Sequence, residues 1–346
     1  MIEVVEGGLL TTVQDAGRPD WTHLGVPIGG ACDPCSLAVA NMLVGNEPGA
    51  AAIEMTIAGP MLAPRAPIVL GLAGADLGGV VAPGGRRLEP GRSHRLESGW
   101  TISFPGSSGT TGGEPPGARA YLSVPGGFDV PTVLGSRSTA LAAAFGGLDG
   151  RPLRAGDLLG PARPASPAIG PRVWPVLDGD PFRGDPASPI RVLRGPADGI
   201  EALVADSWRV AADSDRVGLR LDRSPADANL GTGAGAGAGG DGAGGDGRMA
   251  SHGVVFGAVQ VPADGRPIIL LADHQTTGGY PVPAVVASVD RPRLGQLRPG
   301  SPVSFVEIGE AEAVAALALQ RAALERGAAL LREAAGWDAL WETAGG

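Results

Sequence analysis

The sequence predicts a mainly β protein built from two related lobes. A motif of the form Gly-Gly-aromatic-x-Val-Pro-x-Val-x-x-Ser occurs at 126–136 and again at 278–288. Short segments with the two-residue period of half-buried strands recur along the chain. The 58 Gly and 32 Pro residues supply frequent turns between such strands. Short strands with Gly/Pro turns favour a barrel or sandwich over a parallel sheet enclosed by helices.

The repeat extends beyond its central motif. An apolar run precedes each copy, and the pattern Leu-Arg-x-Gly follows each copy, at 153–156 and 297–300. Upstream, Pro-Ile leads to a Gly and an Asp in both copies. Three matches in one order indicate two copies of a single β unit. We therefore divide the chain into an N-terminal segment at 1–65, a first β repeat at 66–160, a Pro-rich linker at 161–188, a second β repeat at 189–308 and a C-terminal helix at 309–346.

Local patterns place strands inside these repeats. Trp100, Ile102 and Phe104 alternate with polar residues, as a half-buried strand requires. Val255, Gly257, Val259 and Val261 are expected to share one face of another strand. Residues 231–247 are almost entirely Gly, Ala and Asp, which cannot bury apolar area, so we expect a disordered insertion within the second repeat.

Two helices are predicted. The first has Asp33 as its N-cap, Pro34 at the first helical position and Gly45 at its end. The second starts near residue 310 in a stretch rich in Ala, Leu, Glu and Arg. Its expected apolar stripe consists of Val314, Leu317, Leu324 and Leu331.

Composition excludes several function classes. The net charge of −9 lacks the basic excess that a duplex-binding protein needs, so nucleic acid is not an expected partner. All 27 basic residues are Arg, which excludes a Walker lysine, a Schiff-base lysine and a biotinyl-lysine on this chain. Neither a signal peptide nor a membrane span is predicted, and with two cysteines the chain fits a reducing cytoplasm.

No metal site is predicted. The four His residues lack the spacing of known metal motifs. Cys32 and Cys35 have C-x-x-C spacing at the start of the first helix, where the helix dipole lowers a thiol pKa. No βαβ context or second pair accompanies them, so we interpret them as packed side chains. His274, next to Asp273, is an alternative general base, although neighbouring strand residues face opposite ways.

The strongest candidate for chemistry is the segment at 275–280. Gln275, Thr276 and Thr277 precede the second Gly278-Gly279-Tyr280 motif, whereas the first copy lacks such a triplet. Successive Gly N–H groups beside an amide and hydroxyls can stabilise an oxyanion, and the alternative is a polar β-turn. The Ser136–Thr139 segment offers the same two interpretations. Arg216 follows Asp215 and is a candidate clamp for a substrate carboxylate.

Several motifs together resemble the allophanate hydrolase subunit 2 family of biotin-dependent carboxyltransferases, which includes the KipA type and the type found as the C subunit of 5-oxoprolinase. These motifs are Gly8–Arg18, Gly25–Pro34, Ala40–Asn46, Ser214–Gly218, Gly257–Pro267 and Leu271–Pro281, and the resemblance covers roughly residues 2–308. Within them it marks Gln260, Gln14, Asp15 and Arg18 as further expected substrate-binding residues.

The resemblance implies carboxyltransferase subdomains A and B, each a cyclophilin-like β-barrel. It also implies a partner chain with subdomains C and D, and possibly a LamB/YcsF-type subunit. The first functional expectation is a subunit, inactive alone, of an ATP-dependent 5-oxoprolinase that opens 5-oxoproline to glutamate. The alternatives are a carboxyltransferase subunit of a urea carboxylase or allophanate hydrolase system, using biotin carried on another chain, and a non-catalytic KipA-type regulator that binds a kinase-inhibitor protein.

Overall fold

The computed structural model describes residues 1–106, 117–162, 170–175, 188–224 and 249–344. The predicted Gly-rich insertion at 231–247 and most of the predicted linker lie outside these ranges. The chain forms two compact units. Unit 1 consists of Met1–Arg18, Gly29–Phe182 and Arg321–Gly346, and unit 2 consists of Pro19–Ile28 and Arg183–Gln320.

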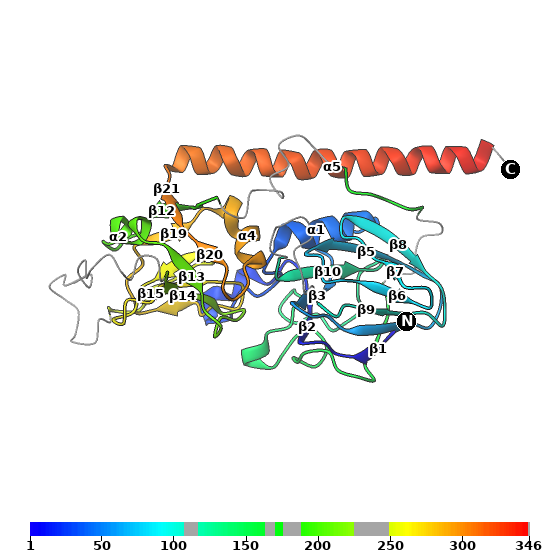
Figure 1. Cartoon of the computed structure of the whole chain (residues 1–346), viewed down its shortest axis with the longest axis horizontal. Helices are drawn as coiled ribbons and strands as arrows, with labels where there is room; N and C mark the ends of the chain where they lie inside the picture. Colours follow the sequence, from blue (N-terminus) through cyan, green and yellow to red (C-terminus); the bar gives the residue numbers. More distant parts are fainter. Residues whose placement is uncertain (107–116, 163–169, 176–187, 225–248, 345–346) are drawn as a thin grey trace. The chain divides into compact units, whose positions relative to one another are not determined.

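Unit 1 is built on two antiparallel sheets. Its strands are β1 (Ile2–Glu6), β2 (Leu10–Gln14), β3 (Ala52–Thr56), β4 (Met61–Pro64), β5 (Ile68–Gly74), β6 (Val80–Ala82), β7 (Arg86–Arg87), β8 (Arg92–Leu96), β9 (Thr101–Ser103), β10 (Arg119–Ser123) and β11 (Leu158–Leu159). One sheet has the order β11-β1-β4-β9-β6-β7 and the other the order β2-β3-β10-β5-β8 (Figure 1). A 3-10 helix, η2, spans Leu141–Ala143. The apolar core of unit 1 lies on these sheets and includes Val4, Ile53, Leu62, Phe104 and Leu122.

Helix α1 (Pro34–Leu43) lies on the five-stranded sheet, with its capping as the sequence predicts. Asp33 accepts a hydrogen bond from the Ser36 backbone N–H at 2.9 Å, which satisfies one of the free donors of the first turn. Gly71 on β5 permits the close approach of the helix, because a Cβ there would lie 2.1 Å from the Ala40 carbonyl oxygen. The two cysteines at the start of α1 are buried and form no disulfide.

Unit 2 contains one large sheet of eight strands. Its strands are β12 (Ile190–Arg194), β13 (Trp208–Val210), β14 (Gly218–Arg223), β15 (His252–Gly253), β16 (Ala258–Gln260), β17 (Ile268–Leu270), β18 (Thr277–Gly278), β19 (Ala284–Val286), β20 (Pro302–Val303) and β21 (Phe305–Glu307). The sheet order is β20-β13-β14-β17-β16-β19-β12-β21, while β15 and β18 form a separate pair. Only the β12–β21 pairing is parallel among the described strands of this sheet. The helices are η1 (Pro19–Leu24), α2 (Ile200–Ala205), η4 (Ser288–Asp290) and α4 (Arg291–Gln296).

The mainly β fold is confirmed, and one strand prediction is wrong. Ile102 in strand β9 and Phe104 directly after it are buried, as predicted, and Trp100 directly before it is half-buried. The segment at 255–261 does not alternate: β16 covers only Ala258–Gln260, and Val255 is 50% exposed. The reason is a turn, in which the Ala258 N–H bonds to the Val255 carbonyl and Gly257 takes a φ of 91°.

The C-terminal helix α5 (Glu310–Ala344) contributes to both units, with the division after Gln320. In unit 1, Leu331 is buried, and Leu324 and Ala328 pack in the same apolar cluster, which contains Trp174 and residues of α1. Val314 is 67% exposed, so its predicted place on the buried stripe is wrong. The helix turns by about 100° per residue, and the buried positions run instead through Gln320, Ala323, Gly327 and Leu331.

Candidate functional site

The sequence-predicted site residues fall into two sets that belong to different units. Gln14, Asp15 and Arg18 are in unit 1. Arg216, Asp215, Gln260 and the segment Gln275–Tyr280 are in unit 2. We describe each set within its own unit.

In unit 1, Asp15 holds the loop that follows the first repeat motif. Its carboxylate accepts hydrogen bonds from the Ser136 hydroxyl at 2.6 Å, from the Ser138 hydroxyl and from the Arg137 backbone N–H at 2.6 Å. The Gly17 N–H donates to the same carboxylate at 2.8 Å. A carboxylate with this many donors is fixed in place. The polar cluster at 136–139 is therefore a turn held by hydrogen bonds, the structural one of its two interpretations.

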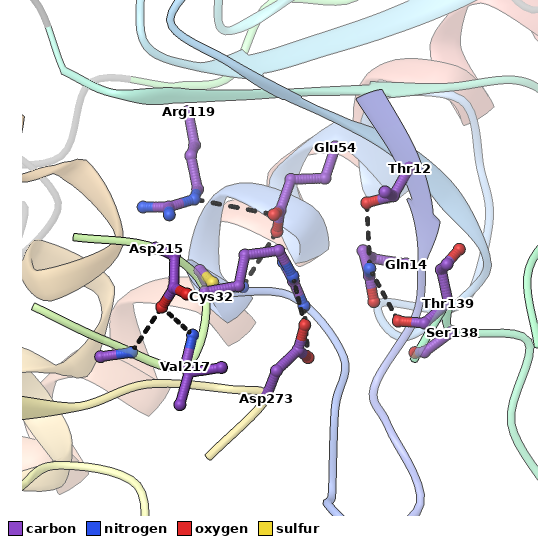
Figure 2. Close-up of polar contacts among 12 residues, drawn as sticks. Thr12, Gln14, Cys32, Glu54, Arg119, Ser138, Thr139, Asp215, Val217 and Asp273 are labelled. Atoms are coloured by element: carbon purple, nitrogen blue, oxygen red, sulfur yellow. Dashed lines mark hydrogen bonds and ion pairs between the residues drawn. The ribbon is translucent and has the colours of Figure 1, made fainter. Parts of the chain in front are cut away.

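Arg18 and Gln14 support the same loop. The Arg18 guanidinium donates to the Ser138 carbonyl at 2.6 Å and lies 4.9 Å from the centre of the Phe145 ring. The Gln14 amide donates to the Thr12 hydroxyl at 3.0 Å and to the Thr139 carbonyl at 3.3 Å (Figure 2). Gln14 and Arg18 are both almost completely buried. Their contacts within unit 1 therefore hold the loop, and a role in substrate binding remains a prediction.

Unit 1 also contains a buried polar cluster that sequence reasoning missed. Glu54 accepts hydrogen bonds from the Tyr121 hydroxyl at 2.7 Å and the Cys32 backbone N–H at 3.0 Å, and forms an ion pair with Arg119 at 3.6 Å. Figure 2 shows Glu54 with Cys32 and Arg119. The Asp33 N–H donates to the Tyr121 oxygen at 2.8 Å. Burial, followed by the negative charge of Glu54, raises the pKa of Tyr121. The phenol therefore stays protonated and anchors the segment before α1 to the sheet.

In unit 2, Arg216 forms a buried bidentate ion pair with Asp273. Its Nε and Nη2 lie 2.8 Å and 3.0 Å from the two carboxylate oxygens of Asp273. The Asp273 backbone N–H also donates to the Arg216 carbonyl at 3.0 Å. Asp215 does not orient this guanidinium, since its exposed carboxylate instead accepts hydrogen bonds from the Val217 and Gly218 N–H groups (Figure 2). The pair fixes the start of the segment at 273–280.

Two glutamine side chains meet beside that segment. The exposed Gln275 amide donates to Oε1 of the buried Gln260 at 3.1 Å. Gln260 Nε2 is buried and has no hydrogen-bond partner among the described residues. Gly278 lies next to it, because a Cβ at this position would come within 2.3 Å of Gln260 Nε2. An inward-facing amide donor beside a glycine can bind a carbonyl oxygen of a small ligand.

The Gly278-Gly279 pair does not form a polar β-turn, the alternative interpretation of this segment, because Gly278 belongs to a strand. Gly126 and Gly127 of the first repeat have φ values of 86° and 71°, whereas Gly278 lies in the extended strand β18. The Gly279 carbonyl accepts a hydrogen bond from the Met249 N–H at 2.7 Å. Thr277 pairs with Gly253 and is exposed, and Thr276 and Tyr280 are half-buried. In the second repeat neither glycine has a positive φ, and Gly278 leaves space for Gln260.

His274 lies directly before Gln275 and, unlike a solvated histidine, is buried and hydrogen-bonded to the backbone. It is 2% exposed, and its Nδ1 lies 2.6 Å from the Gln275 carbonyl oxygen. Because a carbonyl only accepts hydrogen bonds, Nδ1 carries the proton and Nε2 of the neutral ring presents a lone pair. Nε2 is buried and has no partner in the described part of the chain. Burial and the nearby Arg291 lower the pKa of His274, which keeps the ring neutral.

These contacts join residues far apart in the sequence, and only part of the set was predictable. The resemblance marked Gln260 and Gln275, but no local signal links Arg216 to Asp273 or His274 to Arg291. No group of three or more His, Cys, Asp or Glu side chains suited to a metal ion occurs in the described ranges. Within the same ranges, every helix is too short or too polar to cross a membrane.

Comparison with known proteins defines the class. A family model, the carboxyltransferase domain with subdomains A and B, matches residues 24–307. The chain belongs to this family, as its motifs predicted.

Individual relatives refine the comparison. The chain is 33% identical to the C subunit of 5-oxoprolinase from Escherichia coli, over 91% of this chain and 94% of that protein. It is 31% identical to urea amidolyase of Lachancea kluyveri, over 88% of this chain but 17% of that protein. The crystal structure of Kluyveromyces lactis urea carboxylase matches with a TM-score of 0.77 and 27% identity, over 94% of this chain and 29% of that one.

Proposed function

We propose that this protein is a subunit of an ATP-dependent 5-oxoprolinase, which adds water across the lactam bond of 5-oxoproline to give glutamate. The observation that carries the proposal is the near end-to-end match to a separate 5-oxoprolinase subunit, at 33% identity over 94% of that relative. Matches to urea amidolyases involve less than a fifth of those proteins. The match to the 5-oxoprolinase subunit therefore covers nearly all of that relative, whereas the matches to urea amidolyases cover one part of theirs.

The second repeat supplies the proposed substrate site. Opening a lactam places negative charge on its carbonyl oxygen, so donors that face this oxygen accelerate the reaction. Gln260 Nε2 is such a donor, and Gln275 holds Gln260 in place. Thr276, Thr277, Gly278, Gly279 and Tyr280 complete the segment around it. We assign Arg216, with Asp273, to positioning this segment, and its direct contact with substrate remains a prediction.

ATP and partner chains complete the proposed activity. The absence of Lys leaves this chain without a Walker-type phosphate site, so we place ATP binding on a partner subunit. A partner with carboxyltransferase subdomains C and D is expected, as is a LamB/YcsF-type subunit. The chain alone should be inactive.

Reconstitution tests this function. The chain is co-expressed with the candidate partners, purified by size-exclusion chromatography and supplied with ATP and L-5-oxoproline. We expect co-elution and one glutamate formed per phosphate released. Gly278→Ala should reduce turnover by about 10²-fold or more, because its Cβ displaces the Gln260 amide. Gly309→Ala is a matched control, since its Cβ meets no atom within 4 Å and its φ is not positive. A pure, assembled complex that forms no glutamate would overturn the proposal.

A carboxyltransferase role is the second candidate, and the 31% identity to a urea amidolyase favours it. The amide donor of Gln260 fits the ureido carbonyl of biotin as well as it fits a lactam. Biotin would have to reside on another chain, because this one has no Lys to carry it. Carboxylation of urea by the chain together with a biotin-carrying partner, without glutamate formation, would select this function.

A further inference from the structure

Arg291 differs from the other arginines that are withdrawn from water in unit 2, because no carboxylate accompanies it. Arg216 pairs with Asp273, and Arg191 pairs with Asp290 at 2.7 Å. The Arg291 side chain has no ion pair or hydrogen bond to any described residue, and its Nε is buried, while its backbone N–H donates to the Ser288 carbonyl. Its guanidinium lies 5.4 Å from the centre of the Phe256 ring, and burial lowers its pKa.

An unpaired, partly desolvated guanidinium is costly unless an anion neutralises it. The flat face of Arg291 is supported by Phe256, which restricts the side chain and leaves the edge N–H groups available. This arrangement is suited to a planar anion such as a carboxylate, which accepts from two of those N–H groups at once.

Arg291 lies near the candidate site. Phe256, which contacts Arg291, lies just before β16, the strand that holds Gln260, and the nearby Val254 N–H donates to the Thr276 carbonyl at 3.1 Å. His274 lies two residues before Thr276, and its Nε2 is a buried acceptor without a partner among the described residues. His274 Nδ1 is bonded to the Gln275 carbonyl, and the Gln275 side chain donates to Gln260. Three side-chain groups without a hydrogen-bond or ion-pair partner among the described residues therefore belong to this region: a cation on Arg291, an acceptor on His274 and a donor on Gln260.

We propose that Arg291 and His274 form a subsite that binds a carboxylate and an adjacent ring N–H of the substrate, next to the carbonyl donor Gln260. This inference rests on the proposed function, since 5-oxoproline carries a carboxylate, a ring N–H and a ring carbonyl in that order. Arg291 binds the carboxylate, His274 Nε2 accepts from the N–H, and Gln260 Nε2 donates to the carbonyl oxygen. Each group then gains the partner that it lacks among the described residues.

The contribution of each contact can be measured by isothermal titration calorimetry, in which three ligands are bound to the assembled complex without ATP. They are L-5-oxoproline, 2-pyrrolidone, which lacks the carboxylate, and the lactone analogue of 5-oxoproline, in which oxygen replaces the N–H. Arg291→Gln should weaken 5-oxoproline binding at least about tenfold and leave 2-pyrrolidone binding unchanged. His274→Phe should abolish an about tenfold preference of the parent for lactam over lactone.

Arg209→Gln is the matched control, because it removes the same charge from an exposed position on β13 and should change neither affinity. Retained 2-pyrrolidone binding also shows that a variant is folded. The subsite would be overturned if Arg291→Gln bound 5-oxoproline as tightly as the parent does. It would also be overturned if the parent bound the lactone as tightly as the lactam. Either result would hold even if the complex hydrolyses 5-oxoproline. A complex that needs Arg291 to distinguish 5-oxoproline from 2-pyrrolidone, yet forms no glutamate, would support the subsite and overturn the proposed reaction.

Discussion

At the scale of single residues, the Arg216–Asp273 pair has a clear effect on stability. Removing one partner of a buried ion pair costs about 3–5 kcal/mol. We expect Asp273→Ala to reduce the free energy of unfolding by about this amount, measured by urea denaturation. Asp213→Ala is the control, because its pairs with Arg220 and Arg266 are exposed and worth less than about 1 kcal/mol. Equal effects of the two substitutions would contradict a stabilising role for the buried pair.

His274 gives a second test, in which pH is varied. Its pKa in the fold is lowered, first by burial and then by Arg291, while the Gln275 carbonyl and Asp273 act in the opposite direction. The unfolded chain therefore binds a proton more readily than the folded chain. The contribution of the neutral His274 to the free energy of unfolding should be fully present above about pH 6.5. It should decline as the pH falls from there through the lowered pKa.

His274→Asn removes the titrating group and should make this decline smaller than in the parent. Unfolding free energies at about pH 7.5, 6.5 and 5.5 provide the measurement. Because burial also lowers the pKa of His94, the variant is expected to keep some pH dependence of its unfolding free energy. The test is therefore the difference between the parent and the variant. Identical declines in both proteins would show that His274 protonates equally in the folded and unfolded states.

At the scale of elements, the contact between Gly327 on α5 and Trp174 is sensitive to the size of the side chain at position 327. A Cβ at Gly327 would lie 2.3 Å from the indole ring. Alanine favours a helix by about 1 kcal/mol over glycine, but overpacking costs about 1–3 kcal/mol. With a rigid ring as the obstacle, we expect Gly327→Ala to lower the melting temperature.

A double-mutant cycle separates these two effects. In a Trp174→Leu background the indole is absent, so adding Gly327→Ala should raise stability by up to about 1 kcal/mol. If the substitution destabilises both backgrounds equally, the loss does not come from the ring.

Elements with signals in neighbouring residues were predictable, and their contacts were not. Asp33, Pro34 and Gly45 define α1 because capping depends on residues within one turn. The pairs Asp15–Ser138 and Arg216–Asp273 join residues 123 and 57 positions apart. Periodicity shows which side chains are buried but not which partner they meet. The family resemblance indicated Gln260 and Gln275 because both lie in its motifs. Arg291 lies in none of these motifs, so the sequence did not mark it.

At the scale of the whole molecule, α5 divides between the units, so shortening the chain should affect them unequally. Ending the chain at Gln320 removes Leu324, Ala328 and Leu331 from the cluster around Trp174. We expect a loss of at least about 3 kcal/mol in unit 1, from the missing apolar contacts. Hydrogen exchange provides the measurement: amides of α1 and β5 should exchange faster, while β16 and β17 keep their protection. Unchanged exchange in both units would contradict this division of the helix.

The division of the chain also has a consequence for biosynthesis. Unit 1 begins at Met1 and is completed only by residues of α5, while most of unit 2 is made in between. At typical rates of translation, Leu331 leaves the ribosome about 8–30 s after Trp174, with roughly 160 residues added in that interval. Until then the apolar surface formed by α1 and Trp174 lacks its cover from Leu324 and Leu331. The nascent chain therefore exposes this surface during the synthesis of unit 2, which makes it a binding site for chaperones that the finished protein no longer offers.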